Sequence, residues 1–262
     1  MAKIFVGTSG YIYSHWENGV FYPTSWPKSK KLEYYCQHFK TVELNSTFYR
    51  LPVEKTFESW YKRTPKNFIF ALKGWRFITH IKKLKDCQDL WKTFLERALI
   101  LKEKLGPVLF QTSPSLKADF QVLENFCQML QKTSPKNLRF AFEFRNETWC
   151  QNQTYQILKK YNFAWTIVDS PSFPKVFKIT SDFVYLRMHG SKILFASKYT
   201  KKELKDLAKR IKEWQKQNLN VFVYFNNDAQ GYAIENAKQL LFLLGLTESI
   251  RKNKIIKSKV KI

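Results

Sequence analysis

The chain has 262 residues, of which 44% are hydrophobic and 17% aromatic, enough to fill the core of one domain of ordinary size. Its longest apolar runs, such as Leu240–Leu244, fall far short of the ~20 residues that span a bilayer, and its start shows no secretory pattern, so we expect a cytoplasmic protein that does not enter the membrane. The formal net charge of +24 arises from 36 lysines and 9 arginines against 21 acidic residues; such a charge attracts polyanions, although an AT-rich genome produces the same lysine-rich composition.

Eight short apolar runs follow one another along the chain, and helical patterns separate most of them. Strands that alternate with helices indicate a parallel sheet covered on both faces, and eight such units predict a single (β/α)8 barrel of the TIM type. Such a barrel takes about 250 residues, so we expect it over residues 1–246, followed by a basic C-terminal tail over residues 247–262. The predicted strands are Lys3–Thr8, Thr41–Asn45, Phe68–Lys73, Pro107–Gln111, Leu138–Arg145, Phe163–Asp169, Phe183–His189 and Val221–Asn226.

Most of the connections between these strands carry a helical pattern. A long aromatic loop, Tyr11–Pro27, comes first, and a loop of this length is typical of a functional face. The segment Ser170–Ser181 holds two prolines and is too short for a good helix, so the sixth helix is expected to be short or irregular. Helices are predicted from near residue 29 and over residues 53–63, 86–104, 119–131, 153–161, 200–217 and 233–244.

Polar side chains gather at the carboxyl ends of the predicted strands. Side chains alternate between the two faces of a strand. In the fifth strand the phenylalanines take the parity that faces the helices, so Glu143 and Arg145 point into the mouth of the barrel. The same parity directs Glu43, Arg187 and His189 inward. Barrel interiors normally hold branched apolar side chains, so this set requires either an internal ion-pair network that plugs the barrel or a polar ligand.

The residue types at the mouth suggest roles in catalysis and binding. Glu43 or Glu143 is expected to act as base and His189 as acid, because a histidine titrates near neutral pH. If the reaction is glycosidic, the two glutamates would form the carboxylate pair. Substrate contacts are expected from Asn45, Tyr49, Lys73, His80, Gln111, Arg145, Arg187, Asn226 and Asp228.

Signatures of cofactors and metals are missing from the sequence. The chain has neither a P-loop nor a GxGxxG motif, so no cofactor is expected. A metal site built from His80, His189, Glu143, Asp169 or Asp228 is chemically possible. Without an HxH or HExxH motif, and with four cysteines that form no CxxC pair, we expect no metal.

Several ordered segments resemble the domain-of-unknown-function 72 family, also called YecE-like. The resemblance runs from about residue 3 to residue 244 and implies a TIM-type barrel, but it implies no established reaction. Tyr11 stands where the family often has tryptophan, the run from Gln111 to Pro114 replaces a more usual Gln-Leu-Pro-Pro, and the basic tail is peculiar to this chain. The matching segments are Gly7–Tyr11, Phe21–Pro23, Val42–Tyr49, Ile78–His80, Leu105–Gln111, Ala141–Arg145, Leu186–Gly190 and Tyr224–Asp228.

Two functions from different classes remain open at this point. The first is an enzyme that acts on a phosphorylated small molecule or a nucleic acid at the C-terminal face of the barrel. It would use general acid–base chemistry, for example to hydrolyse a phosphoester or glycosidic bond. The second is a non-catalytic protein whose basic surface and tail bind nucleic acid or another polyanion. The enzyme leads by analogy, because chemistry in this fold sits at this face. The sequence leaves the oligomeric state undetermined.

Overall fold

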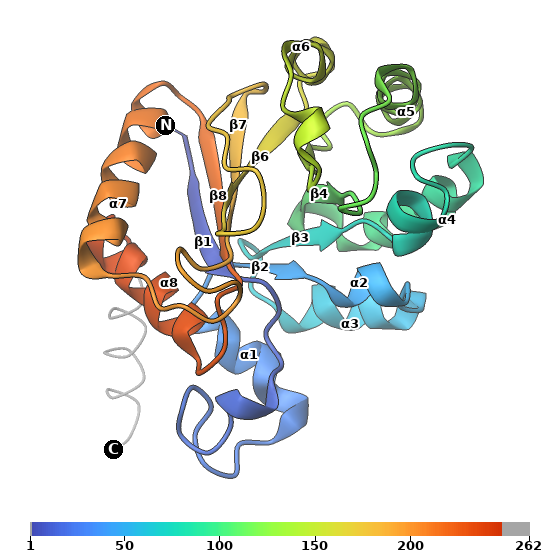
Figure 1. Ribbon diagram of the computed structural model, residues 1–262. Helices are drawn as coiled ribbons and strands as arrows, with labels where there is room; N and C mark the ends of the chain where they lie inside the picture. The colour runs from blue at the N-terminus through green and yellow to red at the C-terminus, as the bar shows by residue number, and fades with distance from the viewer. Residues whose placement is uncertain (1, 248–262) are drawn as a thin grey trace.

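Eight parallel strands form a nearly closed barrel in the computed structural model, which describes residues 2–247 (Figure 1). Neighbours pair in the order β1-β8-β7-β6-β5-β4-β3-β2, so β2 to β8 follow the order of the chain and β1 pairs with β8. This architecture confirms the predicted TIM-type barrel. The strands are β1 (Ile4–Thr8), β2 (Thr41–Leu44), β3 (Ile69–Lys73), β4 (Leu105–Gln111), β5 (Phe140–Glu143), β6 (Ala164–Asp169), β7 (Phe183–Met188) and β8 (Asn220–Phe225).

Helices surround the strands, as Figure 1 shows. The α-helices are α1 (Lys31–Cys36), α2 (Ser46–Tyr49), α3 (Glu54–Arg63), α4 (Gln88–Ala98), α5 (Phe120–Thr133), α6 (Asn152–Lys160), α7 (Lys201–Lys216) and α8 (Tyr232–Leu243). Four 3-10 segments and one short π-helix complete the described set: η1 (Ser14–Trp16), η2 (Lys28–Lys30), η4 (Leu99–Lys104) and η5 (Glu147–Trp149) are 3-10, and η3 (Phe77–Ile81) is the π-helix. The connection between β6 and β7, where a short or irregular helix was expected, is fully described and is irregular, with no helical turn.

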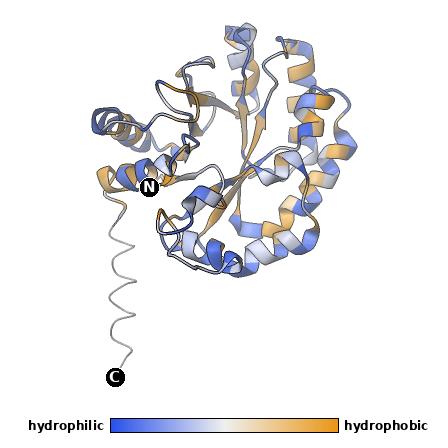
Figure 2. Cartoon of the chain, turned by 60° about the horizontal axis from the view of Figure 1, so that its bottom comes forward, coloured by the Kyte–Doolittle hydropathy of each residue, from blue (hydrophilic) through white to orange (hydrophobic). Residues whose placement is uncertain are grey.

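Two hydrophobic layers meet at the strands, one inside the barrel and one between the strands and the helices. Figure 2 shows mostly hydrophobic strands and helices that carry both kinds of residue. The phenylalanines of β5 pack outward in the larger layer, as their parity predicts. The smaller layer fills the barrel with side chains that include Ala71, Leu109, Ala141, Tyr185 and Phe222. Since mainly apolar groups occupy this inner layer, the charged side chains Glu43, Lys73, Glu143 and Arg187 lie toward the carboxyl ends of the strands.

A side chain from a helix, rather than a regular strand ladder, joins β1 and β2. Within residues 2–247, only one bridge, Ser9 to Glu43, pairs the two segments. The hydroxyl of Tyr35 enters from α1, accepts from the Thr8 amide at 3.0 Å and donates to the Thr41 carbonyl at 3.1 Å. A Cβ on Gly7 would stand 2.3 Å from that same carbonyl oxygen, so the close approach requires glycine. A helix side chain therefore satisfies the backbone groups where the ladder fails.

One predicted helix is shorter than expected. The helix predicted over residues 86–104 ends at Ala98, and the 3-10 segment Leu99–Lys104 follows it. Within that segment Lys102 has φ 49° and ψ −127°, a conformation outside the helical region, so the α-helix does not extend to residue 104. The predicted basic tail lies, apart from residue 247, outside the described residues. Within the part of the chain that the structure describes, no helix combines the length and the apolar character needed to cross a membrane.

Candidate functional site at the mouth of the barrel

A cavity of about 600 Å³ opens at the carboxyl ends of the strands. Six strands, β2, β3, β4, β5, β7 and β8, or the residues just after them, contribute side chains to its wall, since parallel strands end at the same side of a barrel. All nine residues expected to contact substrate line it: Asn45, Tyr49, Lys73, His80, Gln111, Arg145, Arg187, Asn226 and Asp228. The structure thus brings these residues together, while their role in binding stays a prediction.

The floor of the cavity is the guanidinium of Arg187, which is 1% exposed. Its Nη2 donates to Glu43 Oε1 at 2.7 Å, its Nε donates to both oxygens of the same carboxylate, and its Nη1 donates to Glu143 Oε2 at 2.6 Å. Glu43 also accepts from the hydroxyls of Tyr185 at 2.8 Å and Ser9 at 2.6 Å. Both Glu43 oxygens are therefore occupied, and Glu43 functions in this geometry as the anchor of Arg187.

Glu143 is held between two arginines. Its second oxygen accepts from Nε of Arg145 at 2.8 Å. Burial raises the pKa of Glu143, but the charges of Arg187 and Arg145 outweigh burial and hold that pKa well below its usual range. Glu143 is consequently a permanent carboxylate near neutral pH, with neither oxygen free.

His189 lies beside this network and is fully buried. Its Nε2 is 3.7 Å from Glu143 Oε2, and its Nδ1 is 3.1 Å from the amide nitrogen of Asn226. Burial, and then the charge of Arg187, lower the pKa of His189, so the ring is neutral at pH 7. The three residues expected to be catalytic, Glu43, Glu143 and His189, thus lie beneath the cavity and are absent from its lining.

Lys73 lies in the cavity wall at the end of β3 and is 7% exposed. Its Nζ is 4.0 Å from the centre of the Phe48 ring, and among the described residues no hydrogen bond or ion pair reaches it. Burial, followed by the positive charges of Arg187 and Arg145, lowers the pKa of Lys73 to about 7 despite the two glutamates. A buried amine with this pKa is partly uncharged at neutral pH, the form that can accept a proton or attack a carbon.

Two amide oxygens flank Lys73 without partners. The buried Oδ1 of Asn45 and Oε1 of Gln111 accept no hydrogen bond from any described residue. Asn45 follows β2 and Gln111 ends β4, the two strands that pair with β3. Buried acceptors of this kind are normally satisfied, so both oxygens have an unused capacity to accept a hydrogen bond.

The sequence did not identify His15 as a site residue, although it places His15 in the long aromatic loop expected to cover the functional face. Nε2 of His15 lies 2.8 Å from Oδ2 of Asp228, and the indole nitrogen of Trp16 donates to Oδ1 of the same carboxylate at 3.0 Å. Burial raises the pKa of Asp228, and these two hydrogen bonds oppose the rise. A carboxylate thus orients a half-exposed histidine at the cavity, a pairing that can support proton transfer. Tyr13, Phe48, Phe195 and Ala229 complete the part of the lining that the sequence missed.

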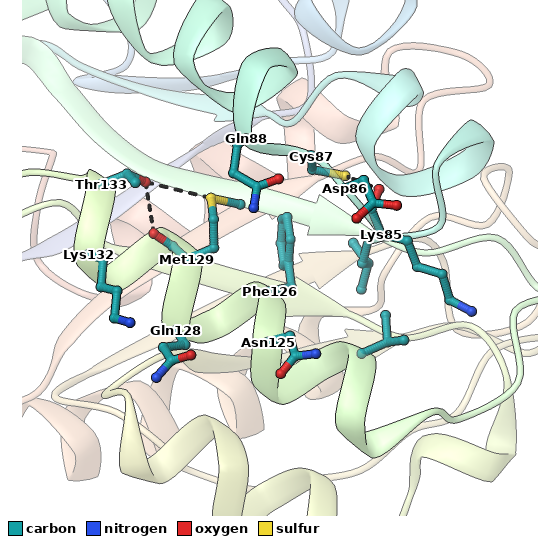
Figure 3. Close-up of a pocket in the computed structure, with 12 residues that line it drawn as sticks. Lys85, Asp86, Cys87, Gln88, Asn125, Phe126, Gln128, Met129, Lys132 and Thr133 are labelled. Carbon is teal, nitrogen blue, oxygen red and sulfur yellow. Dashed lines mark hydrogen bonds between the residues drawn. The ribbon is translucent and has the colours of Figure 1, made fainter.

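A second cavity, of about 660 Å³, lies outside the barrel between the start of α4 and α5 (Figure 3). Its polar groups are a few exposed surface side chains and the thiol of Cys87. Burial raises the pKa of that thiol to about 11, so the thiol stays protonated and unreactive. Among the described residues of this lining, charged groups do not converge as they do at the mouth.

Comparisons with known proteins agree with the fold. The family model described as "Protein of unknown function DUF72" matches residues 5–259. UPF0759 protein YunF of Bacillus subtilis is 29% identical over 94% of this chain and 96% of its own length, and UPF0759 protein YecE of Escherichia coli is 36% identical over 30% of this chain and 29% of its own. The crystal structure of a DUF72 family protein from Thermotoga maritima superposes with a TM-score of 0.82 at 30% identity, covering 93% of this chain and 99% of that one. One from Enterococcus faecalis superposes with a TM-score of 0.78 at 25% identity, covering 93% and 96%.

Proposed function

The chain belongs to the DUF72 family of TIM-barrel proteins, and we propose that it is an enzyme that acts on a phosphorylated substrate at the barrel mouth by general acid–base chemistry. The proposal assigns the phosphate to Arg145 and the proton transfers to the His15–Asp228 pair. Glu43 and Glu143 position the arginines beneath the substrate.

The terminal N–H groups of Arg145 at the cavity, unpaired within the described chain, are the main support for a phosphate site. Only its Nε is used internally, in the bond to Glu143, and its guanidinium lies 4.0 Å above the Phe173 ring. Its terminal N–H groups have no partner among residues 2–247, and the side chain lines the cavity. A guanidinium with a fixed plane and free terminal donors matches two oxygens of a phosphate.

Proton transfer is assigned to His15 because it reaches the cavity and Glu143 does not. A general base must lie within hydrogen-bonding distance of the proton it removes. Both oxygens of Glu143 and of Glu43 are bound to arginines, and both carboxylates hold the same guanidinium, so they do not form the separate acid and base of a glycosidase. His15 is 38% exposed on its side chain and held by Asp228.

The test follows the fate of phosphorylated metabolites. The purified protein is incubated with a small-molecule cell extract, and phosphorylated compounds are followed by mass spectrometry. We expect one such compound to be consumed, with kcat about 10²–10⁴-fold lower in His15→Asn and KM raised in Arg145→Gln. His38→Asn, outside the cavity on the side of α1, is the matched control and should turn over like the unmodified protein. Consumption of no phosphorylated compound, or equal consumption by all three variants, would refute the assignment.

Polyanion binding is a second candidate, and the net charge of +24 favours it. Lysine and arginine contacts to phosphates supply most of non-specific nucleic-acid binding. This function would use the surface and the C-terminal tail rather than the cavity, so the two candidates are separable by experiment.

A further inference from the structure

We propose that Lys73 is a nucleophile that forms a Schiff base with a phosphorylated hydroxy-aldehyde or hydroxy-ketone in the mouth cavity. This inference rests on the proposed function, because it places the phosphate of that substrate at Arg145. It adds the class of substrate and the residue that bonds to it covalently.

The Lys73 amine lies where a substrate carbonyl in the cavity could reach it. Its Nζ borders the cavity, lies against the Phe48 ring at 4.0 Å and is not engaged by any described carboxylate or carbonyl. The pKa of about 7, caused first by burial and then by Arg187, leaves roughly half of the amine uncharged at pH 7. Only the uncharged amine attacks a carbonyl carbon, and desolvation is one of the means by which enzymes prepare lysines for this reaction.

Comparison with the other buried lysines supports the assignment. Nζ of Lys104 donates to the carbonyl oxygens of Tyr61 and Thr64, each at 2.6 Å, and Nζ of Lys31 binds a carboxylate oxygen of Glu17 at 2.5 Å. These two amines have structural partners that explain their burial. Lys73 has none within the described part of the chain, so its burial at a cavity requires a different explanation.

The groups around Lys73 indicate which carbonyl compounds fit. The unpartnered oxygens of Asn45 and Gln111 lie on the two strands that flank β3. Each accepts a hydrogen bond from a hydroxyl group, so hydroxyls beside the reacting carbon would satisfy both. A phosphate at Arg145 and hydroxyls at the two amides together describe a sugar-phosphate-like molecule with a free carbonyl.

The covalent step balances without any further reactant. The Nζ lone pair attacks the carbonyl carbon, a C–N bond forms, and the carbonyl oxygen takes up a proton. Nζ loses a proton, the resulting hydroxyl takes up another and leaves as water, and a protonated imine remains. No oxidation or reduction occurs. The positive imine nitrogen then lies near the carboxylates of Glu43 and Glu143, whose charges already act on Nζ.

The test uses pyridoxal 5′-phosphate as the probe, because it carries both an aldehyde and a phosphate. The full chain is treated at pH 7, reduced with borohydride, digested and mapped by mass spectrometry. We expect Lys73 to be labelled at least about tenfold faster than exposed lysines, since far more of its amine is uncharged at this pH. Lys104 is the internal control for a buried lysine and should stay unlabelled. Labelling of Lys73 no faster than that of exposed lysines would overturn the inference.

A second arm separates this inference from the proposed function. Pyridoxal, which lacks the phosphate, should label Lys73 more slowly than the phosphorylated probe, and inorganic phosphate or Arg145→Gln should remove that difference. Fast labelling of Lys73 by both probes alike would support the nucleophile and contradict the phosphate site. Phosphate binding by calorimetry that depends on Arg145, without labelling of Lys73, would support the proposed function and contradict the nucleophile.

Discussion

Arg187 brings a positive charge into the barrel, where two glutamates surround it. Taking such charges out of water costs several kcal/mol per ion, and only close, fully hydrogen-bonded geometry offsets that cost. The bonds of 2.6 and 2.7 Å to Glu143 and Glu43 supply this geometry. The two carboxylates are thus explained by their support of Arg187, and the groups left for chemistry are those in the cavity wall.

Lys73 should make the stability of the protein depend on pH. Its pKa is about 7 in the folded state against 10.5 for an ordinary lysine. Below pH 7 the amine is charged in both states, so the folded state bears the full penalty of burial. Between pH 7 and 10.5 the folded state binds fewer protons than the unfolded state, and stability rises with pH. Lys73→Met should therefore stabilise the protein most at acidic pH.

We expect the gain in unfolding free energy from Lys73→Met to be about 2–3 kcal/mol larger at pH 6 than at pH 9. Urea denaturation at the two pH values measures it. Lys62→Met, at an exposed position on α3, is the control and should show no such difference. An equal effect of Lys73→Met at both pH values would mean that Lys73 is not held uncharged.

At the scale of elements, the β1–β2 seam is the place in the barrel with the fewest strand-to-strand backbone pairs. Two strands that share one bridge within the described chain cannot satisfy each other's backbone groups, so the hydroxyl of Tyr35 on α1 does so. The seam also brings Ser9 to Glu43, which connects it to the floor of the cavity. Glu43 therefore contacts both the seam, through Ser9, and the floor of the cavity, through Arg187.

Tyr35→Phe should destabilise the protein by about 1–3 kcal/mol, because it leaves the Thr8 amide and the Thr41 carbonyl buried without partners. Tyr34→Phe is the matched control, since the hydroxyl of Tyr34 makes no hydrogen bond among the described residues. Hydrogen exchange should show faster exchange of the Thr8 amide in the first variant only. Unchanged protection of Thr8 would contradict the role assigned to Tyr35.

At the scale of the whole molecule, positive charge dominates. The segment Arg251–Ile262 contributes six basic and no acidic residues to a total of +24. If that charge binds polyanions, release of counterions makes the binding weaken steeply with salt. Polyanion binding by the surface and tail would not involve the cavity, where Arg187 is paired with Glu43 and Glu143 and Asp228 with His15.

Deletion of Arg251–Ile262 should weaken binding to duplex DNA and flatten its salt dependence, by up to about 0.9 in the log–log slope for each phosphate that the tail neutralises. Titration across a range of salt concentrations measures both effects. The thermal midpoint of the barrel, recorded by circular dichroism, should stay unchanged. An identical salt slope with and without the tail would mean that its charge reflects composition alone.

The barrel and the direction of most site residues could be predicted from the sequence because both depend on local periodicity. Alternation with period two placed Glu143, Arg145, Arg187 and Glu43 on inward faces, and the order of strands and helices placed their ends at one mouth. The break at Lys102 was not predictable, since the surrounding residues keep a helical pattern.

The sequence by itself therefore determined the architecture and which side chains enter the mouth. Tertiary structure alone decided which of them stay free: Glu43 and Glu143 bind Arg187, His15 meets Asp228 across 213 positions of sequence, and Lys73 is buried without a partner among the described residues. The physical reason is that the period of a strand is set by its own backbone, whereas pairing, desolvation and pKa depend on groups that only the closed barrel brings together.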